Sequence, residues 1–204
     1  MSISKFTVWQ KEASSATYLS LSELELLLNF HYLSHLAFAK GENLLEKGIQ
    51  KHARKEVLDA HIANGVRYKN EIKSGYLPSA SVRWCSDQVG WGLFAEEGLE
   101  EGAFVGEYTG LVRKNDDHTS INNYLFRYPV PDPIGRDYTI DATSGNLIRF
   151  VNHSSAPNTK PIYAFIDGTY HVILVAIHPI PKGVQLTYDY GTSYWYVRSP
   201  PAHL

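Results

Sequence analysis

One stretch decides how this chain folds, and it reads Arg149-Phe150-Val151-Asn152-His153-Ser154-Ser155-Ala156-Pro157-Asn158. An apolar pair gives way at once to a run of polar residues, and Pro157 then prevents a continuing helix. Each of the polar side chains needs hydrogen-bond partners if it is buried. The stretch therefore predicts a fixed loop that holds a polar ligand, with an ordinary polar surface loop as the alternative.

The size and composition of the chain suit a soluble globular protein. Its 204 residues are 44% hydrophobic and 20% charged, which allows one medium domain or one domain with a helical extension. No apolar run approaches the roughly 18–20 residues that cross a bilayer. The N-terminus lacks the features of a secretory signal. We expect no membrane contact, although a signal-independent export route would leave no such mark.

The residues that usually bind metals are few or badly spaced. A single cysteine, Cys85, excludes an intramolecular disulfide and a cysteine-rich zinc cluster. His118, His171 and His178 show no metal-ligand spacing. We therefore expect no metal site.

The charges are unevenly distributed, although the net charge is only −2. Residues 81–141 contain 5 basic and 11 acidic side chains, whereas the segments on either side each carry a small basic excess. The acidic middle argues against direct nucleic-acid binding. It would suit a basic partner through long-range attraction, and a solvated acidic face is the equally weighted alternative.

The first part of the chain, residues 1–79, reads as a helical region. Apolar periodicity predicts helices over 20–40 and 42–63 and a short helix over 66–73, with Ser20 or Ser22 as the first cap. Together they predict a helical hairpin with a basic outer face. Such a hairpin would serve dimerisation or substrate docking.

From residue 81 onward the sequence pattern changes to short apolar and aromatic runs separated by turn residues. Strands are predicted over 82–85, 92–95, 104–109, 111–113, 124–128, 138–141, 161–166, 171–176 and 185–188, with a hairpin turn at Gly168. The fold class is therefore α+β, with small curved sheets rather than one parallel sheet.

These motifs, in this order, resemble the SET domain of protein-lysine methyltransferases over roughly residues 80–196. The resemblance is carried by Gly90-Trp91-Gly92, Gly106-Glu107-Tyr108-Thr109-Gly110, Tyr124-Leu125-Phe126, Tyr138-x-x-Asp141-Ala142, Gly145-Asn146, the stretch quoted above and Leu186-Thr187-Tyr188-Asp189-Tyr190-Gly191. It is strongest to the stand-alone chlamydial SET proteins, including the nuclear effector type. The family fold also threads its C-terminal segment through a loop as a pseudoknot, an exception to the usual unknotted connections.

The resemblance implies methyl transfer from S-adenosylmethionine to a lysine of a basic protein, a histone or a histone-like chromatin protein. It makes Tyr190 the main catalytic tyrosine and Tyr124 a wall of the lysine channel. Tyr188 stands where the family carries Phe or Tyr, and Tyr there implies mono- or dimethylation. The cofactor-binding residues that it implies are Gly90, Trp91, Gly92, Tyr138, Arg149, Phe150, Asn152, His153, Tyr190 and Trp195.

Two departures and two open points accompany the resemblance. Ser155 replaces a common cysteine, and without further cysteines residues 197–204 cannot form a zinc-binding post-SET segment. Tyr194-Trp195-Tyr196 is the expected aromatic cap over the site, or else a plug that packs on the core. Glu107 either orients a polar network near the cofactor or has a structural role.

The class of function and the cellular location also have alternatives. A catalytically silent SET scaffold that binds a partner protein is the alternative to an enzyme. The chlamydial likeness implies either the bacterial cytoplasm or export into the host cell and its nucleus.

Overall fold

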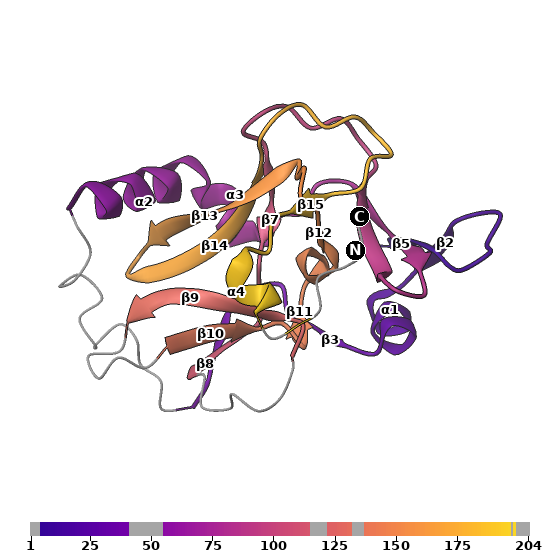
Figure 1. The fold of residues 1–204 in the computed structure, drawn as a ribbon, viewed down its shortest axis with the longest axis horizontal. Coiled ribbons are helices and arrows are strands. Elements are labelled where there is room, and N and C mark those ends of the chain that lie inside the picture. Colours follow the sequence, from indigo (N-terminus) through magenta and orange to yellow (C-terminus); the bar gives the residue numbers. More distant parts are fainter. Residues whose placement is uncertain (1–4, 41–54, 115–121, 132–136, 197, 199–204) are drawn as a thin grey trace.

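The computed structural model describes residues 5–40, 55–114, 122–131, 137–196 and 198, and within them the chain is strand-rich with few helices (Figure 1). The helices are α1 (Leu21–Leu28), α2 (Lys55–Arg67), α3 (Lys69–Ser74), the 3-10 helix η2 (Leu147–Phe150) and α4 (Thr192–Trp195). The strands are β1 (Phe6–Trp9), β2 (Thr17–Leu19), β3 (His31–Tyr32), β4 (Ala37–Phe38), β5 (Ala80–Ser86), β6 (Gly90–Ala95), β7 (Phe104–Glu107), β8 (Leu111–Lys114), β9 (Leu125–Pro131), β10 (Asp137–Asp141), β11 (Ser144–Gly145), β12 (Asn152–His153), β13 (Thr159–Ile166), β14 (Thr169–Ala176) and β15 (Thr187–Tyr188). None of these helices is both long and apolar enough to span a bilayer.

The strands form several small sheets, as the sequence predicts. The larger sheets have the orders β2-β1-β5-β6, β4-β8-β10-β9 and β13-β14-β7, and two short pairs, β11-β3 and β12-β15, connect them. Each strand predicted from residue 81 onward has a counterpart within a few residues of its predicted bounds. Short apolar and aromatic runs separated by turn residues were therefore a sufficient signal in this part of the chain.

The predicted turn at Gly168 is confirmed as the tip of the β13–β14 hairpin. Ile166 pairs with Thr169 across a two-residue loop, and both loop residues have positive φ, 49° at Asp167 and 84° at Gly168. This is the backbone of a type I′ turn, which Asp-Gly favours because Gly adopts positive φ without steric cost.

The prediction of an N-terminal helical hairpin is wrong. Helix α1 begins at the predicted capping box, where Ser20 and Glu23 satisfy each other's backbone N–H groups, but it ends eight residues later. Asn29 then adopts a left-handed conformation (φ 49°). Two short strands follow instead of more helix, because β3 pairs with β11 and β4 pairs with β8. Pairing with distant strands outweighs the local helical preference of an apolar run.

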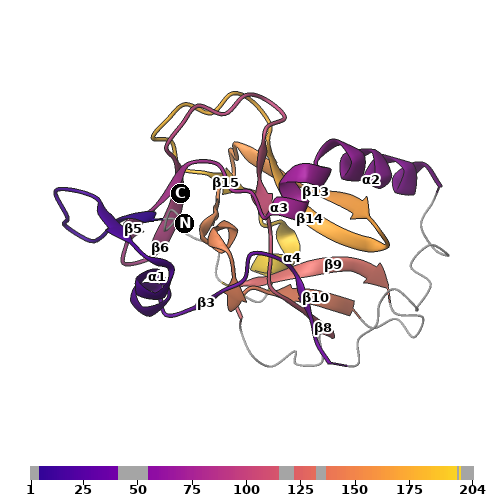
Figure 2. The same cartoon turned by 180° about the vertical axis from the view of Figure 1, so that it is seen from behind.

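The other predicted helices are partly confirmed. The predicted helix over 42–63 begins outside the described residues, and α2 covers 55–67. The predicted short helix over 66–73 corresponds to α3. Helices α1 and α2 lie at opposite ends of the molecule in both views (Figures 1 and 2), so they do not pack as a pair. Strands β1 and β2 precede them in a segment for which the sequence predicts no element.

Helix α2 packs instead on the β13–β14 hairpin (Figure 1). Asn64 Nδ2 donates a hydrogen bond to the carbonyl oxygen of Tyr163 at 2.8 Å. Gly65 lies so close to the carbonyl of Phe165 that a Cβ atom would collide with backbone. The glycine is required here because it lets the helix approach the strand.

Three acidic side chains of residues 81–141 have partners inside the protein. Glu96 Oε1 lies 2.7 Å from Arg83 Nη2, and Asp141 Oδ2 lies 2.8 Å from Arg113 Nη2. Glu107 is buried beside His171. The two arginine pairs leave the acidic excess of this segment unchanged, because Arg83 and Arg113 are already among its five basic residues.

Asp141 gives a prediction for stability. Burial opposes its ionisation, but hydrogen bonds from Thr143, Arg113 and Asn122 outweigh burial and hold the pKa of this carboxyl below its usual range. A lowered folded-state pKa stabilises the protein above the unfolded value of about 3.9 and ceases to do so as the pH falls through the folded value. We expect Asp141→Asn to lower the free energy of unfolding by about 2 kcal/mol at pH 7.

The measurement is urea unfolding of both proteins between pH 7 and pH 3. The difference between wild type and Asp141→Asn should shrink as the pH falls below about 4. Asp87→Asn is the matched control, because the Asp87 side chain is 76% exposed in its pair with Lys11. A difference that persists undiminished at pH 3 would show that the charge of Asp141 is not its source.

Candidate active site

The stretch quoted at the outset lies at the centre of the molecule and is fixed by buried hydrogen bonds. Asn146 caps η2 through its Oδ1, which accepts from the backbone N–H of Ile148 at 3.0 Å. Its Nδ2 donates to the carbonyl of Glu107 at 2.9 Å, and its own N–H donates to Thr109 Oγ1 at 2.9 Å. All residues of η2 are buried. Arg149, Phe150, Val151 and Asn158 of the stretch are buried, whereas Ser155 and Ala156 are exposed. These contacts favour a fixed loop, and a bound polar ligand stays a prediction.

The C-terminal segment lies directly beside this loop. Strand β12 pairs in parallel with β15. Asn158 binds both sides of that segment, because its Nδ2 donates to the carbonyl of Gln185 at 2.7 Å and its Oδ1 accepts from the N–H of Thr187 at 2.9 Å. Thr159 Oγ1 adds a bond to the carbonyl of Thr187 at 2.8 Å. The polar residues after Val151 thus hold the two segments together, while the threading of a pseudoknot stays a prediction.

Tyr190 is held by two bonds to this pair of segments. Its hydroxyl donates to the carbonyl of Val151 at 3.0 Å. Its backbone N–H donates to His153 Nδ1 at 3.2 Å, so in the neutral imidazole the proton resides on Nε2. Trp195 of α4 lies edge-on to His153 at 5.0 Å and stacks on Tyr190 at 6.1 Å between ring centroids. Trp195 therefore packs on His153 and Tyr190, which fits both a cap over the site and a plug on the core, whereas Tyr196 is 91% exposed.

A continuous group of aromatic rings extends inward from Tyr190. Ring centroids are 4.7 Å apart for Tyr190 and Tyr188, 6.2 Å for Tyr188 and Phe126, and 5.3 Å for Phe126 and Tyr108. The Tyr108 hydroxyl donates to the backbone carbonyl of Tyr124 at 3.0 Å. We call Tyr108, Tyr124, Phe126, Tyr188 and Tyr190 the tyrosine cluster.

Three hydroxyls of this cluster, those of Tyr108, Tyr188 and Tyr190, stay protonated near neutral pH. Burial, reinforced by neighbouring tyrosines, raises the pKa of Tyr188 and of Tyr190 well above the ordinary value of about 10. Burial raises the pKa of Tyr108 in the same way. These hydroxyls can therefore donate and accept hydrogen bonds near neutral pH, but they cannot supply a phenolate base.

Arg149 contacts the cluster rather than open solvent. Its guanidinium carbon lies 3.8 Å from the ring centroid of Tyr124 and 5.0 Å from that of Phe30. Nη1 donates to the carbonyl of Thr143 at 2.9 Å. Such cation–π contact fixes the face of the Tyr124 ring. The structure thus places Arg149, predicted as a cofactor residue, against a predicted channel tyrosine.

The glycine-rich strand β6 reaches the same loop. Asn152 Nδ2 donates to the carbonyl of Trp91 at 3.1 Å. At Gly92 a Cβ atom would lie 2.6 Å from Gln185 Nε2 and 2.7 Å from Cys85 Sγ, so a side chain would displace both. Gly90 has φ +75°, which favours glycine. The predicted residues Trp91, Gly92 and Asn152 are therefore brought together.

Two other predicted cofactor residues lie in the core. Tyr138 is 1% exposed and Phe150 is 5% exposed. Phe150 packs edge-on against Phe30 at 5.6 Å. Both positions are explained by packing, and a role in cofactor binding stays a prediction for each.

Sequence reasoning missed two residues that complete the site. Tyr108 lies within a quoted motif, but no role was assigned to it. Arg198 connects α4 to the segment that precedes β9. Its Nη2 donates to the carbonyl of Asn122 at 2.6 Å, and its guanidinium lies 4.1 Å from the ring centroid of Tyr194. An isolated arginine near the C-terminus carries no motif, so nothing in the sequence indicated its role.

Comparison with known proteins agrees with this geometry. The chain matches the SET domain family over residues 90–191, half of its length. It is 39% identical over 118 residues to histone-lysine N-methyltransferase ASHH3 of Arabidopsis thaliana, and 35% identical over 111 residues to histone-lysine N-methyltransferase 2B of Homo sapiens. These matches cover 52% and 50% of this chain but only 30% and 4% of the relatives.

Solved structures show the same fold. The crystal structure of ATXR5 in complex with histone H3.1 matches 83% of this chain and 85% of that chain, with a TM-score of 0.63 and 20% identity. An active polycomb repressive complex 2 matches 59% of this chain and 16% of that chain, with a TM-score of 0.50 and 28% identity. The family motifs lie together around the Asn152–His153 loop. The chain belongs to the SET domain family.

Proposed function

We propose that this chain is an S-adenosylmethionine-dependent protein-lysine N-methyltransferase that acts on histones or histone-like basic proteins. The observation that carries the proposal is the Tyr190 hydroxyl, fixed on the carbonyl of Val151 within a buried tyrosine cluster and beside the Asn152–His153 pair. The relatives named histone-lysine N-methyltransferases support it. Tyr190 and Asn152 are both intact, so no observation favours the silent scaffold.

The residues around Asn152 and His153 fit S-adenosylmethionine, which supplies a methyl group on a sulfonium when bound. Asn152 holds the carbonyl of Trp91, glycine at position 92 leaves room for the side chains of Gln185 and Cys85, and the rings of His153, Tyr190 and Trp195 offer flat faces. Aromatic faces and carbonyl oxygens attract a cation. We assign cofactor binding to Gly90, Trp91, Gly92, Asn152, His153, Tyr190 and Trp195, with Tyr138, Arg149 and Phe150 as supporting residues.

The tyrosine cluster supplies the second requirement, a neutral lysine amine. A free lysine amine has a pKa of about 10.4 and is protonated at neutral pH. Apolar aromatic surroundings disfavour the charged form and lower that pKa without a dedicated base. The protonated hydroxyls of Tyr190, Tyr188 and their neighbours then orient the amine, so that catalysis is largely alignment.

Tyr188 is proposed to limit the product to mono- or dimethyllysine. Its ring lies 4.7 Å from that of Tyr190, so its hydroxyl takes up room beside the amine. We expect Tyr188→Phe to shift the product toward higher methylation without loss of the first transfer. Mass spectrometry of the modified substrate measures this, with Tyr76→Phe, at a half-exposed position, as the matched control. An unchanged product distribution would contradict the assignment.

The substrate class and the cellular setting rest on different support. Structures related to this one contain histone H3, which supports a histone substrate. The likeness to chlamydial effectors, and with it a location in the bacterial cytoplasm or the host nucleus, rests on the sequence motifs. We keep a SET unit at 80–196, an N-terminal region at 1–79 and a tail at 197–204 as proposals. The proposed homodimer through the N-terminal region loses its support, because the helical hairpin that it required does not form.

The activity is tested with purified protein, labelled S-adenosylmethionine and a panel of histones and bacterial histone-like proteins. We expect label on at least one basic protein and none on an acidic control protein. Calorimetry with the cofactor alone provides an independent readout of binding. Absence of both transfer and cofactor binding would refute the proposed function, whereas binding without transfer would support the silent scaffold.

A further inference from the structure

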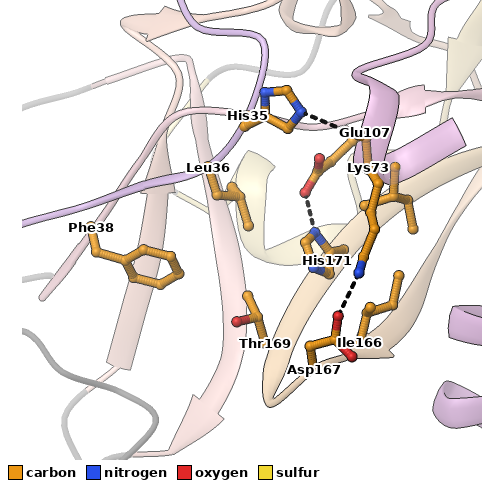
Figure 3. A pocket seen from close by; sticks show the side chains of 10 residues that line it. His35, Leu36, Phe38, Lys73, Glu107, Ile166, Asp167, Thr169 and His171 are labelled. Atoms are coloured by element: carbon orange, nitrogen blue, oxygen red, sulfur yellow. Dashed lines mark hydrogen bonds and ion pairs between the residues drawn. The ribbon is translucent and has the colours of Figure 1, made fainter. Parts of the chain in front are cut away.

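A pocket lies between the segment 35–38, helix α3 and the tip of the β13–β14 hairpin (Figure 3). Its volume is about 320 Å³, which is near the lower end for small-molecule sites. Leu36, Phe38, Ile72 and Ile166 contribute apolar walls. Glu107 and His171 point toward each other within it, as Figure 3 shows.

Glu107 is the unusual group in this pocket. It is 3% exposed, and its Oε1 lies 2.6 Å from His171 Nδ1. Its Oε2 is buried, and no described residue donates a hydrogen bond to it. A buried carboxylate oxygen without a donor is unfavourable, so the site is completed by a group that brings one.

The same residue is linked to the proposed active site through the backbone. Glu107 precedes Tyr108, and neighbouring residues of an extended strand point to opposite faces. Glu107 therefore points away from the tyrosine cluster, while its carbonyl accepts the Asn146 hydrogen bond described above. The pocket thus lies on the other face of β7 from the tyrosine cluster, and a role of Glu107 in a polar network near the cofactor stays a prediction.

The charges of the lining indicate what the pocket takes. Lys73 Nζ is already paired with Asp167 Oδ2 at 2.7 Å, and both side chains are more than half exposed at the rim. Glu107 is the remaining acidic side chain of the lining, and its partner is the imidazole of His171. No group of three or more His, Cys, Asp or Glu side chains in the described part of the chain could hold a metal ion. A singly charged organic cation with an apolar stem matches these features.

We propose that this pocket binds a primary alkylammonium group. The ammonium pairs with the carboxylate of Glu107, and its aliphatic stem lies along Leu36 and Phe38. This chemistry has two sources, a free aliphatic amine or the side chain of a lysine in a bound protein. The proposal needs no methyl transfer, so it stands or falls separately from the proposed enzyme activity.

The test is titration of the whole protein with n-butylammonium chloride, followed by calorimetry and by amide chemical shifts. We expect saturable binding with shifts in the 166–171 segment, and binding of uncharged n-butanol at least tenfold weaker. Glu107→Gln should weaken n-butylammonium at least about tenfold, because one hydrogen bond to a charged group is lost. Glu100→Gln, an exposed carboxylate that does not line the pocket, is the matched control and should change nothing.

A second variant covers the case in which Glu107→Gln fails to fold. Phe38 is 40% exposed, so Phe38→Ala should fold. It should weaken n-butylammonium several-fold and leave methylammonium unchanged, because only the longer stem reaches the ring. Competition by a blocked lysine peptide would assign the source as a protein lysine, and binding of free amines alone would assign a small amine; both support the pocket.

The proposal is overturned by any of three results. The first is no saturable binding of n-butylammonium to the folded wild type up to about 100 mM. The second is equal affinity for n-butanol. The third is binding that none of the pocket variants changes.

Discussion

Tyr190→Phe is expected to lower the rate of methyl transfer about a hundredfold or more while leaving the protein folded. The substitution removes one hydroxyl, which donates to the carbonyl of Val151 at 3.0 Å. That bond fixes the ring relative to the loop that carries Asn152 and His153. Because catalysis here depends on alignment, a small displacement of the amine reduces the rate strongly.

The backbone contacts of Tyr190 explain why the fold should survive. Its N–H bond to His153 and its stacking on Trp195 do not involve the hydroxyl. The assay is the initial rate of label transfer at saturating substrate, together with the thermal unfolding curve. Tyr196→Phe, at a position 91% exposed, removes a hydroxyl outside the cluster and should leave the rate unchanged. A Tyr190→Phe protein with full activity would remove this residue from the mechanism.

Asn158→Ala is expected to lower the free energy of unfolding by about 3 kcal/mol. The side chain is 8% exposed and satisfies two backbone groups, the carbonyl of Gln185 and the N–H of Thr187. Alanine leaves both groups buried without a partner, and each costs about 1–3 kcal/mol. The two hydrogen bonds that are lost hold the C-terminal segment beside the central loop.

A second substitution at the same position separates the two bonds. Asn158→Asp keeps an acceptor for Thr187 but sets a carboxylate against the carbonyl of Gln185, so it should also be destabilising. Urea unfolding followed by tryptophan fluorescence measures both variants. Ser155→Ala, at an exposed position in the same loop, is the control and should change stability by less than about 0.5 kcal/mol. Equal stability of Asn158→Ala and wild type would mean that water replaces the amide.

The sequence predicted the second half of the chain well, because its elements are short and its signals are local. Short apolar and aromatic runs between turn residues indicate the strands, and Gly168 after Asp167 indicates the hairpin turn. The polar run after Val151 indicated a fixed loop, because so many donors and acceptors need partners. Motif order then brought Trp91, Asn152, His153 and Tyr190 to one place.

The first part of the chain was predicted poorly for a physical reason. Residues 20–40 contain enough leucine for a helix, yet β3 and β4 form within them because their partners β11 and β8 lie about a hundred and about seventy residues away in sequence. Such pairing leaves no local pattern. The contact of Arg149 with Tyr124 and the role of Arg198 were hidden for the same reason, since each depends on a neighbour that only the fold supplies.

The pairing of β1 has a practical consequence for dissecting this protein. Strand β1 lies between β2 and β5, and β4 borders β8, so two sheets that contain strands of the SET unit also include strands from the first forty residues. A truncated chain starting near residue 80 would present unpaired strand edges to solvent, which promote edge-to-edge aggregation. Insolubility of such a fragment would reflect those open edges rather than any loss of catalytic groups. Deletion experiments on this protein are better begun before Phe6 than at the start of the family motifs.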